Sequence, residues 1–537
     1  MSKATIKRRK LVQAGLGLAA GSGLSAKLAA HESAKQETRF DASYDVVVVG
    51  SGSGLCGALK AATAGLKVLV LEKDQGIGGT TLVSGGVLWV PNNRVQKAAG
   101  LEDNEKDART YLQKLSLGQA SDELIDAFVE QGPDMLEFVE ANTQIEWRVS
   151  QMLGDAADYH PDWPGSRMKG RSIEPVRDGV GMSGGILISS LASACREAGV
   201  TFMTKAPAKQ LIAKDSEQGV EVLGVLAETE QGSMRIQARR GVLMASGGFE
   251  RNPEMMKHFL RGPVSYSWGA EGNVGDGIKM GMALGADLRN MNECWHQVAY
   301  TAEGEAVGHV RGAISLFGQI ERRNASGITV NRYGERFANE CAAYDVSWRS
   351  FHTWENWGGT GMRNMPAYAI FDQKARENET IGGATKDQPL PDWVTVADTL
   401  EELAAKLNID EKGLDTTVQR FNKYAKKGQD PDFHRGENTY DRGGDHPVSV
   451  ALAPLDKGPF YGAEVSPATL GTCGGLRVNA KAEVIDVFDR PIRGLYASGN
   501  TSGVGSPGAL YGGGGGTLGP AFTFAYIAGK ELVSREI

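Results

Sequence analysis

The stretch DVVVVGSGSGLCG, residues 45–57, decides the fold. Its run of valines bounded by glycine is typical of a strand that is buried on both faces of a parallel sheet. The glycines that follow predict a tight turn, and residues 58–64 are predicted to form a helix. A second apolar strand is predicted over residues 67–71. A strand, a helix and a strand in this order indicate an α/β fold that contains a parallel sheet.

A glycine turn between a strand and a helix predicts a Rossmann-like dinucleotide site. Glycine lets the backbone approach a pyrophosphate, and the helix N-terminus supplies amide donors. Glu72 ends the second strand, where an acid accepts hydrogen bonds from ribose hydroxyls, and Lys73 follows it. The third glycine of the motif is either Gly54, in a shortened turn, or Gly57, in the GxGxxG spacing. We prefer the shortened turn.

A second loop of glycines and hydroxyls, GGTTLVSGG at residues 78–86, narrows the nucleotide to FAD. Nicotinamide enzymes have no use for such a loop at this point, whereas FAD must also be held along its ribityl chain and pyrophosphate. Later stretches at residues 242–248 and 494–500 predict two more strands with turns, and residue 517 opens the last helix. The N-terminal amides of that helix are expected to face the electron-rich pyrimidine edge of a non-covalently bound flavin. The predicted cofactor contacts are Gly50, Gly52, Gly54, Glu72, Lys73, Gly79, Thr80, Thr81, Ser84, Gly85, Gly86, Ala245, Gly247, Gly499, Asn500, Thr517 and Leu518.

Glycine is over-represented: 71 of the 537 residues are glycine, which is about 13% against a usual share of about 7%. There is no G-X-Y period and there are only 19 prolines, which argues against collagen and low-complexity disorder. Ten glycines lie in residues 50–86 and eleven in residues 494–519. Two clusters at opposite ends of the chain suggest two parts of one site.

Composition excludes several other classes of protein. The formal charge of −7, without a basic stripe that carries aromatic residues, argues against nucleic acid as a partner. The five cysteines show no CxxC or CxxCH spacing, so structural disulfides, haem attachment and zinc sites are not expected. The eight histidines show no HxxxH or HxH pairing, so we expect no metal. No apolar run reaches the roughly 18 residues of a membrane helix.

The first thirty residues contain six basic residues and no acid. Arg8 and Arg9 precede a weakly apolar stretch, which resembles a twin-arginine export signal and predicts a periplasmic protein. The match is partial, because Lys7 stands where a serine or threonine is usual and residues 28–30 are not a strict A-x-A site. The alternative is a disordered basic tail on a cytoplasmic enzyme. We assign residues 1–43 to a signal and linker outside the fold.

The ordered motifs resemble the flavoprotein superfamily of fumarate reductases and 3-ketosteroid dehydrogenases, over residues 44–537. The resemblance implies a split FAD domain, residues 44–296 and 458–537, with an inserted α+β catalytic domain at residues 297–457. Residues 400–427 carry the helical periodicity expected in such an insertion.

Charge separates the two branches of this superfamily. A dicarboxylate reductase must clamp carboxylates, and the bidentate fork of arginine is the usual device. Residues 494–528 contain no charged side chain, and Tyr511 is followed there by glycines at 512–516. A neutral surface with a phenol and backbone amides suits an apolar ketone. The lack of CxxCH sites also removes the electron feed of the multihaem fumarate reductases.

Three tyrosines bring the chain nearer to the 3-ketosteroid Δ1-dehydrogenase family. Tyr511 precedes Gly515 by the family's four-residue spacing, Tyr344 lies in the Asn-Glu-x-x-x-Tyr-Asp element at 339–345, and Asp158-Tyr159 precedes the Gly-Arg-Ser stretch at 170–172. The chain departs from the family at residues 512 and 514, which are glycines where prolines are frequent. A related Δ4-(5α) dehydrogenase is expected to carry serine at position 513, which is glycine here.

The resemblance implies a mechanism for 1,2-dehydrogenation of a 3-ketosteroid. Tyr511 and the amide of Gly515 would hydrogen-bond the C3 oxygen, Tyr344 would remove the C2 proton with help from Tyr159, and N5 of FAD would accept hydride from C1. We expect electrons to pass to an external acceptor such as a quinone, with peripheral membrane contact as a further expectation. The alternatives are a flavin enzyme for another enone, a Δ4-ketosteroid or an unsaturated acid, and an electron-transferring subunit without its own substrate.

Overall fold

The computed structural model describes residues 39–151, 158–178, 182–216, 219–302, 324–343, 346, 348–356, 361–505, 508 and 510–537. From Ala42 to Ile537 the chain folds as one unit, which is described here by itself. The predicted export signal falls outside the described residues and stays a prediction. None of the helices among the described residues combines the length and apolar character that crossing a membrane requires.

The predicted parallel strands lie side by side in the larger sheet, whose order is β18-β19-β8-β9-β1-β2-β6, with β7 paired to β8. Strand β1 (Ala42–Val49) runs parallel to β2 (Val68–Leu71) on one side and to β9 (Gly232–Met244) on the other. The valines at 46–49 are buried, as expected of a strand covered on both faces. The remaining strands are β6 (Thr201–Met203), β7 (Ala208–Ser216), β8 (Gly219–Thr229), β18 (Glu483–Ile485) and β19 (Pro491–Ala497).

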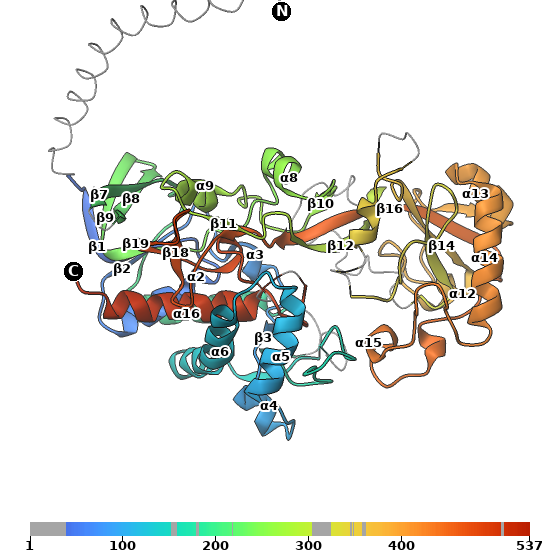
Figure 1. The fold of residues 1–537 in the computed structure, drawn as a ribbon, viewed down its shortest axis with the longest axis horizontal. Helices are drawn as coiled ribbons and strands as arrows, with labels where there is room; N and C mark the ends of the chain where they lie inside the picture. The colour runs from blue at the N-terminus through green and yellow to red at the C-terminus, as the bar shows by residue number, and fades with distance from the viewer. Residues whose placement is uncertain are drawn as a thin grey trace, which may run out of the picture. The chain divides into compact units, whose positions relative to one another are not determined.

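Helix α2 (Gly54–Thr63) follows the first glycine turn and lies beside the last helix, α16 (Leu518–Ser534) (Figure 1). Both candidates for the third glycine of the motif have a packing reason. A Cβ on Gly54 would lie 2.8 Å from the Val48 side chain, and one on Gly57 would lie 2.6 Å from the Ala525 carbonyl oxygen. Gly54 therefore lets α2 approach the sheet, and Gly57 lets it approach α16.

A smaller sheet has the order β10-β16-β14-β13, and β12 and β15 also pair with β16. The periodic segment of residues 400–427 forms two helices, α13 (Leu400–Leu407) and α14 (Glu411–Ala425). Their apolar side chains pack on one face of this sheet. The smaller sheet contains strands from both sides of the expected domain limits. β12 crosses the expected limit between residues 296 and 297, and β16 lies wholly after the expected limit between residues 457 and 458. The strands are β10 (Tyr266–Ser267), β12 (Cys294–Tyr300), β13 (Gly327–Asn331), β14 (Ala367–Asp372), β15 (Thr395–Ala397) and β16 (Phe460–Thr472).

Short sheets and helices complete the described fold. A three-stranded sheet has the order β3-β5-β4, and β11 pairs with β17. The three strands are β3 (Leu88–Trp89), β4 (Trp147–Val149) and β5 (Ser172–Pro175), and the pair is β11 (Leu288–Arg289) and β17 (Gly475–Leu476). The other helices are α3 (Gly79–Leu82), α4 (Arg94–Ala98), α5 (Glu105–Ser116), α6 (Asp122–Asn142), α7 (Gly184–Glu197), α8 (Pro253–Phe259), α9 (Asp276–Met282), α12 (Gln373–Asn378) and α15 (Thr439–Arg442), with 3-10 turns η3 (Trp348–His352), η4 (Val448–Val450) and η5 (Gly499–Thr501).

The contact between α2 and α16 predicts that a methyl group at residue 57 destabilises the protein. Gly57→Ala should destabilise the protein by about 1–3 kcal/mol, because the added methyl group overlaps a backbone carbonyl. Gly185→Ala, in the first turn of α7, is the control, since a Cβ there meets nothing within 4 Å. That change should stabilise the protein by up to about 1 kcal/mol through helix propensity. Thermal unfolding of both variants measures this, and equal melting temperatures would contradict the close helix contact.

Candidate active site

A cavity of about 720 Å³ opens where the parallel strands of the larger sheet end. Its wall includes Gly50 after β1, Glu72 after β2, Ala245 after β9 and Ser498 after β19. Ligands of open α/β sheets bind at this edge, outside the carboxyl ends of the strands. Both glycine clusters contribute to the wall, so the two clusters form parts of one site as the sequence suggested.

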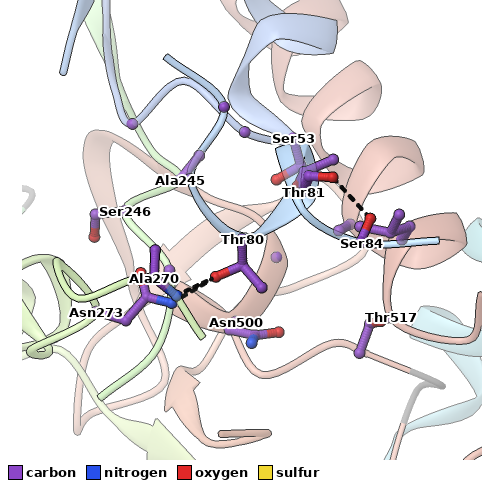
Figure 2. A pocket seen from close by; sticks show the side chains of 18 of the residues that line it. Ser53, Thr80, Thr81, Ser84, Ala245, Ser246, Ala270, Asn273, Asn500 and Thr517 are labelled. Atoms are coloured by element: carbon purple, nitrogen blue, oxygen red, sulfur yellow. Dashed lines mark hydrogen bonds between the residues drawn. The ribbon is translucent and has the colours of Figure 1, made fainter. Parts of the chain in front are cut away.

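The structure brings almost all the predicted cofactor contacts together. Every one of them lines the cavity except Gly54, which begins α2 and packs against Val48 instead. Figure 2 shows Thr80, Thr81 and Ser84 on the second glycine loop, across from Ala245, with Asn500 and Thr517 contributed by the C-terminal cluster.

Glu72 connects the first glycine turn to the second. One of its carboxylate oxygens accepts hydrogen bonds from the Ser51 amide at 3.2 Å and from the Ser51 hydroxyl at 2.5 Å. The Ser51 hydroxyl in turn accepts a hydrogen bond from the amide of Gly78 at 2.8 Å. The acid predicted to meet a ribose thus also fixes the two loops that lie beside it.

Two helices, α2 and α16, begin at the cavity. Ser53 precedes α2 and Thr517 precedes α16, and neither side chain caps its helix with a hydrogen bond. Both residues line the cavity. The positive end of each helix dipole suits phosphate oxygens and the electron-rich edge of a flavin. The residues present therefore fit FAD.

Sequence reasoning missed one wall of the cavity, the segment of residues 270–276 that precedes and enters α9. The Lys73 ammonium lies 2.5 Å from the Asp276 carboxylate. The Ala270 amide and the Asn273 side-chain amide each donate to the Thr80 hydroxyl at 2.9 Å. The glycines at 269, 272, 275 and 277 are the signal that could have identified this wall.

Aromatic side chains form the other end of the cavity. Tyr511, which is 5% exposed, stacks on Tyr159 with ring centroids 5.7 Å apart and the ring planes inclined by 23°, and Trp295 meets Tyr511 edge-on at 5.1 Å. The Tyr511 hydroxyl is 3.0 Å from that of Thr517. Tyr440 of α15, which sequence reasoning missed, packs on Tyr159 at 4.8 Å. The predicted base, Tyr344, lies outside the described residues.

The glycine loop after Tyr511 turns its carbonyl groups toward the protein. The Gly512 carbonyl accepts from the Tyr111 hydroxyl at 2.7 Å and from the Tyr159 amide at 3.0 Å. The Gly514 carbonyl accepts from the Ser172 hydroxyl at 2.7 Å, and the Gly515 carbonyl from the Trp89 amide at 3.1 Å. A Cβ on Gly515, whose φ is +89°, would lie 2.5 Å from a backbone oxygen. Glycine is therefore required where the loop meets β3.

A buried ion cluster lies behind this loop. Arg171, 1% exposed, pairs with Asp103 at 2.7 Å and with Asp158 at 2.8 Å. Burial raises the pKa of Asp158 to about 6, and the charge of Arg171 opposes that shift. Asp158 also accepts a hydrogen bond from the Trp89 indole at 2.8 Å. These contacts fix the position of the residue next to Asp158, which is Tyr159.

The Asn-Glu pair that precedes Tyr344 anchors its segment to other parts of the protein. The Asn339 side-chain amide donates to Asp441 at 2.9 Å, next to Tyr440. Glu340 pairs with Arg336 at 2.7 Å and with Arg435 at 3.1 Å. Burial alone would raise the pKa of Glu340, but the two guanidinium groups hold it at about 2. Both motif residues thus have structural partners.

Comparison with known proteins decides the family. A family model described as an FAD binding domain matches residues 45–518. The chain belongs to this family of FAD-binding flavoproteins. It is an FAD-dependent oxidoreductase, and the predicted cofactor and α/β fold are confirmed.

Relatives of this flavoprotein align over nearly its whole length. It is 34% identical to 3-oxosteroid 1-dehydrogenase of Mycobacterium tuberculosis, covering 92% of this chain and 98% of that protein. It is 33% identical to 4-oxocyclohexanecarboxylate 2-dehydrogenase of Sinomonas cyclohexanicum, covering 92% and 93%. A solved 3-ketosteroid Δ1-dehydrogenase from Sterolibacterium denitrificans, in complex with 1,4-androstadiene-3,17-dione, superposes with a TM-score of 0.82 at 31% identity and covers 92% of this chain and 100% of that chain. The predicted resemblance to the ketosteroid dehydrogenases is confirmed.

The contact of Ser172 with the glycine loop predicts a local effect of its removal. Ser172→Ala should increase hydrogen exchange of the amides at 511–516 about five-fold, because the Gly514 carbonyl loses a hydrogen bond worth about 1 kcal/mol. Ser326→Ala is the matched control, a buried serine just before β13 that donates to Asp372 of β14 at 2.7 Å. Hydrogen-exchange mass spectrometry measures both variants. Unchanged protection of residues 511–516 in the Ser172 variant would contradict the assigned contact.

Proposed function

We propose that this flavoprotein catalyses the 1,2-dehydrogenation of 3-ketosteroids. The observation that carries the proposal is that Tyr511, a member of the aromatic cluster, and Gly515 both line the FAD cavity. The carbonyl groups of the loop are bonded to the protein, and the Gly515 amide donates to no described residue. Its relatives, the 3-oxosteroid 1-dehydrogenases, are named for this reaction.

In the proposed reaction Tyr511 and Gly515 stabilise the enolate. Loss of the C2 proton places negative charge on the C3 oxygen, and a phenol and an amide aimed at that oxygen lower the barrier by roughly 3 kcal/mol per donor. The Thr517 hydroxyl, 3.0 Å from the Tyr511 oxygen, restrains the phenol. Burial of this end excludes water, which strengthens both hydrogen bonds.

Proton removal is proposed for Tyr344, with Tyr159 beside it. A free tyrosine has a pKa near 10, so an unassisted phenol is a poor base at neutral pH. A hydrogen bond donated by Tyr159 would favour the phenolate of the base. Tyr159 is held by the ion cluster around Asp158 and by the hydrogen bond that its backbone amide donates to the Gly512 carbonyl. Bound FAD supplies the acceptor for the electron pair that leaves C1.

The external electron acceptor stays a prediction. The expectation of a quinone, and that of peripheral membrane contact, rest on the resemblance to the family alone.

A second candidate substrate is a smaller ring ketone that carries a carboxylate, because the chain is also similar to 4-oxocyclohexanecarboxylate 2-dehydrogenase. A carboxylate calls for a cationic partner. Among the described residues that line the cavity, Lys73 is the single cationic side chain, and it pairs with Asp276. This favours the neutral steroid over the ring carboxylate.

Anaerobic mixing tests the proposed substrate. Addition of 4-androstene-3,17-dione to the flavin-loaded protein should bleach the flavin absorbance and yield the Δ1 product. The control is 4-oxocyclohexanecarboxylate, which should leave the flavin oxidised. The proposed steroid substrate would be wrong if only 4-oxocyclohexanecarboxylate bleached the flavin. It would also be wrong if the protein reduced enoates and formed no Δ1 product. An electron-transferring subunit would be bleached by neither compound.

The two tyrosines should have separable effects. Tyr344→Phe should abolish exchange of the steroid C2 proton with deuterated solvent, because it removes the proposed base. Tyr511→Phe should slow both exchange and turnover about 100-fold, because one donor to the C3 oxygen is lost. Tyr461→Phe is the control, since its hydroxyl contacts Gln373 at 2.5 Å in the smaller sheet. Retained exchange in the Tyr344 variant would move the role of base to another residue.

A further inference from the structure

Thr80 presents a hydroxyl group whose hydrogen-bonding direction is determined by its neighbours. The side chain lines the FAD cavity, and its oxygen accepts from the Ala270 amide and from the Asn273 side chain, each at 2.9 Å (Figure 2). A hydroxyl oxygen has two lone pairs and one proton. Both lone pairs are occupied, and no described residue accepts the proton.

Asn273 is held in one orientation by a buried carboxylate. Its side-chain nitrogen also donates to an oxygen of Glu250 at 2.5 Å, so both hydrogens of the amide have acceptors. The Ala270 amide is a donor in any case, and the carboxylate oxygen is an acceptor. The nitrogen of Asn273, and not its oxygen, must therefore face Glu250 and Thr80.

Glu250 is built into the protein rather than exposed to the cavity. It is 5% exposed, and its second oxygen accepts from the Thr472 hydroxyl at 3.3 Å. A Cβ on Gly269 would lie 2.2 Å from one oxygen of Glu250, and a Cβ on Gly248 would lie 2.5 Å from the other. Two glycines thus leave the space that the carboxylate fills, between the cofactor loops and β16.

We propose that Glu250 is a positioning residue that acts through Asn273 to make Thr80 a hydrogen-bond donor to FAD. With its lone pairs occupied, the Thr80 hydroxyl has only its proton to offer to a ligand in the cavity. FAD presents phosphate, ribityl and ring acceptors to that proton. The proposal concerns cofactor binding, so it holds whichever ketone the enzyme oxidises.

Affinity for FAD tests the donor. The dissociation constant is measured from the rise in flavin fluorescence when the holoprotein is diluted. Thr80→Val should raise it about ten-fold, the effect of one lost hydrogen bond, whereas Thr80→Ser keeps the hydroxyl and should keep the affinity. An unchanged constant in the Thr80→Val variant would overturn the proposal.

The role of Glu250 is tested by the same measurement. Glu250→Leu removes the acceptor that orients Asn273 and should also raise the constant about ten-fold. Glu250→Gln keeps an acceptor oxygen and should restore near-parental affinity. The matched control is Glu483→Gln, since Glu483 accepts from the Asn479 side chain at 2.8 Å away from the cavity. Equal affinities in Glu250→Leu and the parent protein would refute the role of Glu250.

A double-substitution cycle separates positioning from general destabilisation. If Glu250 acts through Thr80, the protein with both Thr80→Val and Glu250→Leu should bind FAD no more weakly than the weaker single variant. Additive losses, about 100-fold in total, would mean independent effects and would overturn the proposal. Should Glu250→Leu fail to fold, Asn273→Ala breaks the same link and takes its place in the cycle.

Discussion

The close approach of Gly50 to the end of β9 is the constraint on which the cofactor cavity depends. A Cβ at residue 50 would lie 2.2 Å from the Ala245 carbonyl oxygen, and the residue has a φ of +103°. Only glycine satisfies both conditions. The chain can therefore leave β1 and enter α2 within a few residues, which places Ser53, the residue before α2, in the cavity wall. A side chain at residue 50 would push the turn away from the backbone of residues 245 and 246.

Buried charge plays the corresponding part at the aromatic end. The cluster of Asp103, Arg171 and Asp158 is removed from water, and such clusters contribute more to geometry than to net stability. The residues that directly follow Asp158 and Arg171 in the sequence both donate hydrogen bonds to the glycine loop. Tyr159 follows Asp158 and donates to Gly512, and Ser172 follows Arg171 and donates to Gly514. One ion pair thus positions two donors to the same loop, which gives a physical reason for the Asp-Tyr and Gly-Arg-Ser elements to occur together.

The sequence was sufficient for the parallel strands, the first helix and most of the cofactor wall, because their signals are local. Four valines and a glycine turn predict β1 and α2 wherever the remaining strands lie. Contacts between distant segments left weaker signals. Tyr440 reaches Tyr159 across 281 residues of sequence, and β16 pairs with β12 across the expected domain limits. Periodicity cannot report such partners, since it describes which face of an element is buried and not what covers it.

The glycines also show that a local signal does not identify the partner of a residue. The excess was expected to serve the cofactor, and Gly50 and Gly52 do line the cavity. Gly248 and Gly269 instead make room for the Glu250 carboxylate, and Gly54 and Gly57 make room for packing against the sheet and α16. A missing side chain reveals a close approach but not the partner, which can be a ligand, a helix or a buried acid. The glycines of a flavoprotein therefore mark the supports of the site as well as the site itself, and only the structure distinguishes the two.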